Sequence, residues 1–593
     1  MPGAGPSIRH ERVENWKGFA GRLREERGSA LVLVMFIVLL LTILGLSVLT
    51  AAVGGAQRTE TRKNDVQSLH LAEKTLDEAV AYITAGLNKT IQDNVVVSQT
   101  ELEKAIELFL KNLQDDQNIL HASTNLLQSD GGKALGVITS VDYENNNDPT
   151  SSLPVSYLSY RLTLNSQAEV NGVVRNLSQV MVIDTFLDFL NYTLGSERNL
   201  TINGSPYIKG NIYAGDNLTI SDTANYSYRG VDHTFYSKLF QLEGEAHVQS
   251  LQKLIYQDRF LGKLSADRIT PTTDMTGKIP SDKVKIKNHR SFVEVDVVSS
   301  FADKVAEAAG GLALRSEIIN NVQNGTLGEY LISTYGAIFD HPEILPPKPD
   351  PADTTEAGLE AQEAYDEIVK QLTKPSRSLV YEGDLTLDGI ELAGIQYANK
   401  DTNWYIIDGN LKIDNSGRPT PVQVKANILV TGKVEIRGNV EFDSTIFALQ
   451  QASLTGAEEE YTTIVEDASI QGLNDKELVL ISQGPILINR LAAFTNASLA
   501  KPLEAFFYTD SDALLYGVGS VFSLSGGFFA KGNLTINAVR GAATDKDGNF
   551  LVSQDDSQIR FNASYNNRVF TDQKAGLPRV QSINISVEEL QLK

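Results

Sequence analysis

Residues able to carry out chemistry are few in this sequence of 593 residues, and they are scattered. Cysteine is absent, which excludes disulfides, thiolate metal sites and cysteine nucleophiles. There are seven histidines, and His233, His247 and His289 lack the spacing of metal ligands. The sequence motifs of zinc hydrolases, P-loops, serine hydrolases and dinucleotide-binding folds are missing as well. We therefore expect a protein that is not an enzyme and that holds neither a metal nor a cofactor.

The acidic residues give no catalytic assignment either. The chain has 74 Asp and Glu against 52 Lys and Arg, a formal net charge of −22. Polysaccharide-cleaving β-helix enzymes use pairs of acidic residues. Among so many acids some pairs are inevitable, so the presence of a pair does not identify an active site here. Asp545-Lys546-Asp547-Gly548-Asn549 resembles a calcium loop, but Phe550 stands where such a loop needs Gly. A hairpin turn between 534–539 and 550–552 explains this segment better, and the acidic balance argues against nucleic acid as a partner of the body.

A long apolar segment near the N-terminus determines where the rest of the chain lies relative to a membrane. Residues 29–57 contain no charge, and 15 residues between Ala30 and Leu49 are Leu, Val, Ile or Phe. A bilayer core of about 30 Å needs only about 20 apolar residues in a helix. The sequence therefore predicts a single transmembrane helix over 29–57, after a leader of residues 1–28. The leader carries six basic and four acidic residues, so its net charge of +2 places the N-terminus in the cytoplasm and the body outside.

The junction between leader and helix is specific. A charged leader ends in Gly28, and Ser29 opens the apolar run. This junction resembles the class III signal of type IV pilin-like proteins, whose prepilin peptidase cuts after the Gly. The resemblance implies cleavage between Gly28 and Ser29, a bacterial cell-membrane location, and packing among other pilin-like subunits in a surface filament. Leu33 stands at the fifth mature position, where major pilins carry Glu; this is similar to PilX-type minor pilins and K-type minor pseudopilins. The residues expected to pack in the membrane and the filament are Leu31, Leu33, Phe36, Leu40 and Leu44.

Helical periodicity continues after the apolar run. An apolar residue recurs every three or four positions from Val66 to Leu87, and a capping box at Thr100 and Glu103 begins a second helix. We expect stalk helices over 58–115. Two β-rich segments, 157–165 and 173–184, are joined through Asn171-Gly172, a hairpin turn sequence. A helix with a sheet over 116–195 is the arrangement that a pilin-like headpiece would have.

An internal repeat dominates the body. Its pattern is a short apolar run, a polar step, a Gly and then alternating apolar residues, and it predicts stacked coils of a parallel β-helix-like solenoid. An antiparallel sandwich is the alternative. The Gly would occupy a corner with positive φ, or one where backbone approaches backbone. The repeat glycines are Gly383, Gly409, Gly432, Gly484 and Gly532.

The predicted fold is mainly β with α: a membrane-anchored helix, an α+β headpiece and a solenoid body with a helical insertion. We expect the first solenoid strands over 196–239, a helical insertion with a Pro-rich linker over 240–375, and the solenoid body over 376–593. Within the insertion, the spacing predicts helices at 248–255, 301–322 and 355–372.

The predicted function is that of a non-enzymatic minor pilin-like subunit or assembly factor at a filament tip. Its partners would be the membrane, other pilin-like subunits, the prepilin peptidase and a surface or glycan ligand. One alternative is a membrane-anchored adhesin or glycan-binding solenoid that never enters a filament. A second alternative is a polysaccharide-active β-helix enzyme.

Overall fold

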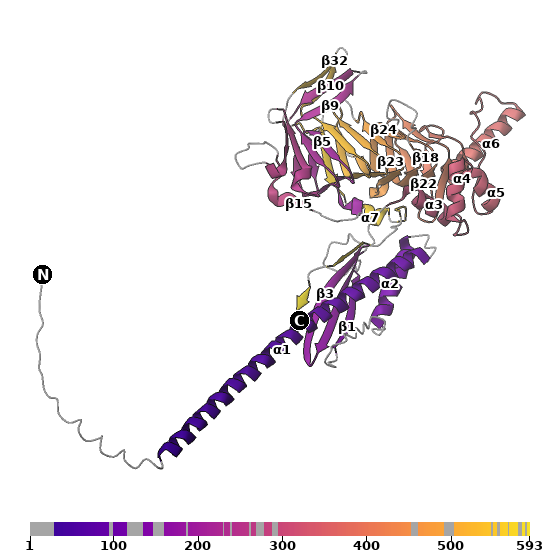
Figure 1. Ribbon diagram of the computed structural model, residues 1–593. Helices are drawn as coiled ribbons and strands as arrows, with labels where there is room; N and C mark the ends of the chain where they lie inside the picture. The colour runs from indigo at the N-terminus through magenta and orange to yellow at the C-terminus, as the bar shows by residue number, and fades with distance from the viewer. Residues whose placement is uncertain are drawn as a thin grey trace, which may run out of the picture.

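The protein consists of a long helix, a small headpiece packed on its second half and a large β body (Figure 1). The computed structural model describes residues 29–93, 99–115, 134–145, 159–184 and most of 188–592. The longest gaps in the last range are 269–277, 287–294, 452–460 and 492–502. The expected class, mainly β with α, is confirmed.

Helix α1 is continuous from Ser29–Asp93, 65 residues in all. At about 1.5 Å per residue it is roughly 96 Å long, three times a bilayer core. No Pro interrupts the segment, so nothing forces a kink between its apolar first half and its amphipathic second half. Helix α2 (Gln99–Asp115) packs beside the second half, where Gly86 of α1 leaves room for the ring of Phe109.

An antiparallel sheet covers the second half of α1 in the order β1-β2-β3-β34, with β35 also paired to β3. The turn Asn171-Gly172 joins β2 to β3 with both residues at positive φ, as the sequence predicts for a two-residue hairpin. The last two strands come from the C-terminus of the chain. The strands are β1 (Ala134–Asn145), β2 (Ser159–Val170), β3 (Val173–Asp184), β34 (Asn584–Val587) and β35 (Gln591–Leu592).

The body is a solenoid whose coils stack through parallel strand pairs. We call one of its sheets the covered sheet, because most of its strands are buried on both faces. Its strands, in stacking order and with the end of β23 between β22 and β25, are β16 (Leu379–Glu382), β19 (Trp404–Asp408), β22 (Asn427–Val430), β25 (Leu478–Ser482), β27 (Leu503–Thr509), β29 (Phe522–Ala530), β4 (Leu194–Ser196), β7 (Ile212–Ala214), β12 (Ala246–Val248) and β15 (Val284–Ile286).

A second sheet alternates between buried and partly exposed residues, so one of its faces is in contact with solvent. We call it the open sheet. In stacking order its strands are β17 (Leu385–Leu387), β20 (Leu411–Asn415), β23 (Val434–Ala448), β24 (Thr463–Gly472), β26 (Ile486–Asn489), β28 (Ala513–Gly517), β30 (Leu534–Ala538), β5 (Leu200–Gly204), β8 (Leu218–Ser221), β13 (Leu254–Asp258) and the antiparallel β14 (Gly262–Ser265).

Shorter strands complete the coils, and two hairpins project from them. The hairpins pair β9 with β10 and β31 with β32. Strand β32 therefore pairs with β31, rather than with residues 534–539 as expected from the sequence. These remaining strands are β18 (Gly394–Gln396), β21 (Val422–Lys425), β33 (Phe561–Tyr565), β6 (Tyr207–Lys209), β11 (Gln241–Glu243), β9 (Thr223–Tyr228), β10 (Val231–Tyr236), β31 (Ala542–Lys546) and β32 (Asn549–Ser553).

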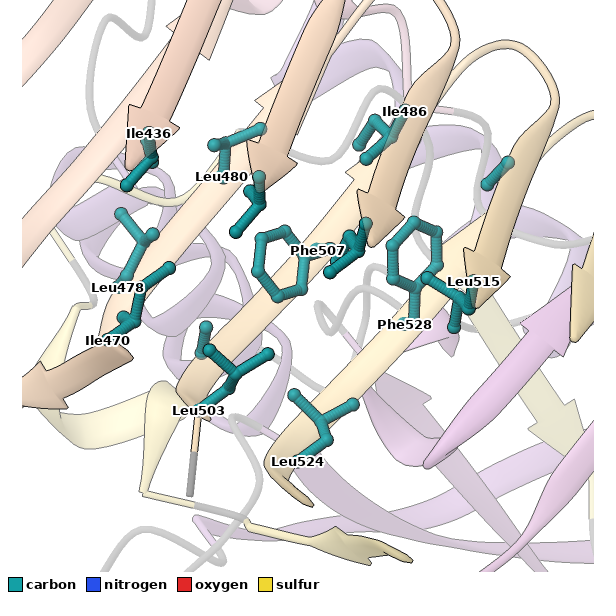
Figure 2. Close-up of a cluster of buried hydrophobic side chains, with 14 of the residues drawn as sticks. Ile436, Ile470, Leu478, Leu480, Ile486, Leu503, Phe507, Leu515, Leu524 and Phe528 are labelled. Atoms are coloured by element: carbon teal, nitrogen blue, oxygen red, sulfur yellow. The ribbon is translucent and has the colours of Figure 1, made fainter. Parts of the chain in front are cut away.

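Apolar side chains stack in the interior of the solenoid from coil to coil. In Figure 2, Leu480 of β25, Phe507 of β27 and Phe528 of β29 lie in a row along successive strands. The rings of Phe507 and Phe528 are stacked with centroids 5.5 Å apart. Such rows arise because parallel in-register pairing places equivalent positions about 4.8 Å apart.

The coils do not stack in sequence order. The chain reaches the middle of the stack at β4 and winds outward to β15 at one end. It then crosses to the opposite end, starts again at β16 and winds back until β29 pairs with β4. Both chain ends of the solenoid therefore lie near its middle, which lets the whole body be inserted between the neighbouring strands β3 and β34.

The crossing is made by helices that pack on the covered sheet and on one end of the stack. Phe301 and Leu331 belong to the same apolar cluster as Trp404 and Phe447, which lie on the outer face of the covered sheet. Leu372 and Ile368 instead pack against the solenoid interior at the β16 end. The helices are α3 (Val297–Ala308), α4 (Arg315–Asn324), α5 (Leu327–Tyr335) and α6 (Glu356–Thr373).

Several boundaries differ from those expected. Residues 248–255 do not form an α-helix. They form strand ends and a short 3-10 turn, η3 (Leu251–Lys253), because their apolar residues lie where two strands meet at a corner of a coil. The helix expected over 301–322 is two helices, separated at Gly310 and Gly311, which both have positive φ. The solenoid extends through β15, so only 297–373 is helical insertion. Residues 584–592 belong to the headpiece sheet instead of the solenoid, because β34 and β35 pair with β3.

Candidate membrane anchor and the attachment of the solenoid

The apolar half of α1 has no protein around it. Leu31 is 68% exposed and Leu44 60%, and Leu33, Phe36 and Leu40 are also exposed. Among the described residues, α1 is the one helix that is long and apolar enough to cross a membrane. A continuous apolar surface of this size on a water-soluble protein would be an aggregation hazard.

The expected cleavage site is only partly within the described residues. Ser29 is the first residue of α1, whereas Gly28 lies outside the described residues. Cleavage after Gly28 would leave a mature chain that begins at the first turn of this helix.

Polar contacts hold the sheet against the second half of α1. The Ser166 hydroxyl donates to the Ala72 carbonyl at 3.2 Å, and the Asn171 amide donates to Asn64 at 3.2 Å. Arg175 of β3 forms an ion pair with Asp65 of α1. These contacts lie beside a buried apolar face that includes most residues of the expected stalk pattern; Val66 is the exception and is 52% exposed. The apolar residues of α1 buried there are Leu71, Ala72, Leu76, Ala79, Ile83 and Leu87.

The repeat glycines lie at coil corners, for two different reasons. Gly383 has a φ of +115°, which favours Gly over other residues. Gly409 and Gly432 do not have positive φ; there a Cβ would collide with the backbone of the preceding coil. At Gly484 and Gly532 a Cβ would meet both backbone and side-chain atoms of neighbouring coils.

The exit of the chain from the solenoid is pinned by buried polar groups. We call residues 566–577, which include α7 (Val569–Asp572), the exit strap. Gln573 is fully buried; its amide donates to Asp443 at 3.1 Å and to the Glu477 carbonyl at 2.8 Å, and it accepts from Lys400 at 3.1 Å. Lys304 of α3 donates to the Ala575 carbonyl at 2.7 Å. The strap is therefore joined to four separate segments of the body.

One acidic side chain under the strap has a strongly shifted pKa. Burial raises the pKa of Glu477 to about 8, and the nearby negative charge of Asp572 adds to the shift. One carboxyl oxygen accepts from the Asn566 amide at 3.0 Å, and the other has no hydrogen-bond partner among the described residues. The raised pKa favours the protonated, uncharged form of Glu477 in the folded protein at neutral pH.

Sequence reasoning missed the return of the C-terminus to the headpiece and the exit strap. Alternation in Asn584-Ile585-Ser586-Val587 is a strand pattern, but nothing in it identifies β3 as the partner. The described residues contain no group of three or more His, Asp or Glu side chains that could hold a metal ion.

Comparisons with known proteins give little further information. No protein-family model matches the chain, and no curated protein matches it. The crystal structure of the competence-associated pilin ComZ from Thermus thermophilus is similar, with 13% identity, 89% of this chain and 98% of that chain covered, and a TM-score of 0.26. At this TM-score the similarity carries no argument, so any function must be supported by the residues and geometry of the chain itself.

Proposed function

We propose that this chain is a membrane-anchored, pilin-like minor subunit that has no catalytic activity and presents its solenoid outside the cell. One observation carries the proposal: α1 is a single helix whose first half is apolar and exposed, while its second half lies under an antiparallel sheet. Such a helix suits a subunit that is held in the membrane before assembly. In a filament its apolar half would then pack against the equivalent helices of other subunits. Such packing would use the face that runs through Leu33, Phe36, Leu40 and Leu44.

The sequence of the leader and the size of the body supply the remaining details. The basic leader keeps the N-terminus in the cytoplasm, and the prepilin peptidase removes residues 1–28 there. The solenoid, from β4 to β33, is far larger than the headpiece that it interrupts. A subunit of this bulk fits best at the end of a filament, where no neighbour has to pack above it.

The absence of an acidic residue at position 33, where this chain has Leu33, also favours a position at the filament tip. In a shaft position this subunit would leave the N-terminal ammonium of a neighbour without a carboxylate partner. An unpaired charge in apolar surroundings costs several kcal/mol. We therefore propose few copies per filament, located at its tip.

Intact mass of the membrane-extracted protein tests the proposed processing. The mass of the mature protein should lack residues 1–28. Gly28→Leu should keep the leader, because the peptidase requires a small residue before the cut, whereas Gly21→Leu, within the same leader, should be processed normally. A full-length mass for the parent protein, or a processed mass for Gly28→Leu, would contradict the proposal.

A further inference from the structure

The open sheet carries a groove that the membrane anchor and the exit strap do not use. It is a cavity of about 580 Å³ that crosses β28, β30, β5, β8, β13 and β14. α3, α5 and the strap pack on the outer face of the covered sheet, whereas the outward side chains of the open sheet are partly exposed. From the geometry of this groove, we propose that it binds an extended, uncharged oligosaccharide.

A ladder of amides forms one wall of the groove. The Asn533 amide donates to Asp512 at 3.2 Å, Asn199 to Asn533 at 2.9 Å and Asn217 to Asn199 at 2.9 Å. Each bond connects one coil to the next, so the side chains are held in place before a ligand arrives. A carboxamide has two N–H groups. The amides of Asn199 and Asn217 each make one ladder bond, whereas the Asn533 amide donates to both carboxylate oxygens of Asp512. Binding sugar hydroxyls would therefore cost little ordering entropy.

A row of hydroxyls runs parallel to the ladder. Thr535, Thr201 and Thr219 lie directly opposite one another on β30, β5 and β8. All three are partly exposed, and their hydroxyls make no hydrogen bond with another described residue. Parallel pairing spaces them about 4.8 Å apart. This spacing is close to the length of one sugar residue in an extended β-linked chain, so consecutive hydroxyls can meet consecutive sugars.

The rest of the lining favours sugar over a charged polymer. Asp512 and Lys263 place one negative and one positive charge in the lining, so the groove lacks the basic surface that an anionic polymer needs. The ring of Tyr461 and the apolar side chains of Ile255 and Leu514 supply apolar contacts of the kind that pack against the faces of sugar rings. From β28 to β13 the groove spans four strand steps, about 19 Å. It therefore has room for roughly four sugar residues.

The groove depends on the unusual order of the coils. Strands β28 and β30 come from the last third of the chain, whereas β5, β8 and β13 all come from its first half. The groove exists where these two parts meet, at the pairing of β30 with β5. This proposal goes beyond the proposed function, because the groove would bind sugar whether or not the chain enters a filament.

Isothermal titration calorimetry on the full chain, held in a detergent without a sugar headgroup, tests the proposal. The probes are cellohexaose and chitohexaose, which are uncharged and β-linked, with maltohexaose as a curved α-linked comparison. At least one β-linked probe should bind saturably, with affinity that rises from dimer to tetramer and then levels off. Failure of both β-linked probes to bind, or equal binding of maltohexaose, would overturn the proposal.

Two variants locate the binding site. Thr201→Val with Thr219→Val removes two outward hydroxyls without changing side-chain shape, and should weaken binding about tenfold. Thr386→Val is the matched control, because Thr386 occupies the equivalent outward position on β17, outside the groove. Unchanged melting temperatures would show that the variants fold. Equal affinity of the double variant and the parent, or displacement of the bound sugar by a short DNA duplex, would contradict the assignment.

Discussion

At the scale of single residues, Glu477 makes the stability of the body depend on pH. Its pKa is about 8 when folded and 4.5 in the unfolded chain, so the folded state holds the extra proton between these values. The stabilising effect of this proton is complete below pH 4.5 and is lost as the pH rises through 8. Between pH 5 and pH 8 the melting temperature of Glu477→Gln should therefore fall less than that of the parent protein.

Thermal melts of the full chain at pH 5, 6.5 and 8 measure this difference. Glu435→Gln is the control, because Glu435 lies on the partly exposed face of the open sheet. If Glu477→Gln kept the full pH slope of the parent, the buried acid would not be its source.

The repeat glycines give a second prediction at this scale. A Cβ at Gly432 would lie 2.5 Å from the carbonyl oxygen of Gly409, so Gly432→Val would force two coils apart. We expect a loss of roughly 1–3 kcal/mol in the free energy of unfolding. The measurement is chemical denaturation, with Thr386→Val as the β-branched control. Equal midpoints for the two variants would refute close backbone contact at the corner.

At the scale of elements, strong local patterns predict well. The sequence correctly predicts the long N-terminal helix, the hairpin at Asn171-Gly172 and the helix that begins after Thr355. It fails at 248–255, because apolar spacing of three and four residues also arises where a strand ends at a coil corner. It also misses β34, because the partner of a strand cannot be read from the strand alone.

The pairing of β34 with β3 can be tested by a matched pair of substitutions. Ile585 packs against the headpiece core, whereas Val587 is 45% exposed. Ile585→Asp should therefore detach β34, while Val587→Asp should not. Hydrogen exchange at the amides of Met181 and Ile183, opposite β34, measures the outcome. Similar exchange in both variants would contradict the assigned burial of Ile585, since both residues lie on the same face of β34 and differ only in how deeply they are buried.

At the scale of the whole molecule, insertion explains the order of the coils. A body inserted between adjacent strands must begin and end at nearly the same point. The solenoid meets this requirement because the chain winds from the middle of the stack to one end and then returns to the middle from the opposite end. The spacing of the repeat predicts coils, but it cannot reveal that β29 stacks on β4, more than 300 residues away in sequence. The sugar groove lies across this seam, so the sequence could not predict it either.

We propose that this chain is a pilin-like subunit placed at the end of a filament. Immunogold labelling of sheared filaments, with antibody against the solenoid, tests it most directly. We predict label at one end of each labelled filament and none along the shaft. Leu33→Glu, which restores a partner for the neighbouring N-terminus, should add label to the shaft if the missing acid is what excludes the subunit. Label spaced regularly along filaments of the parent protein, or filaments without any label, would contradict the account.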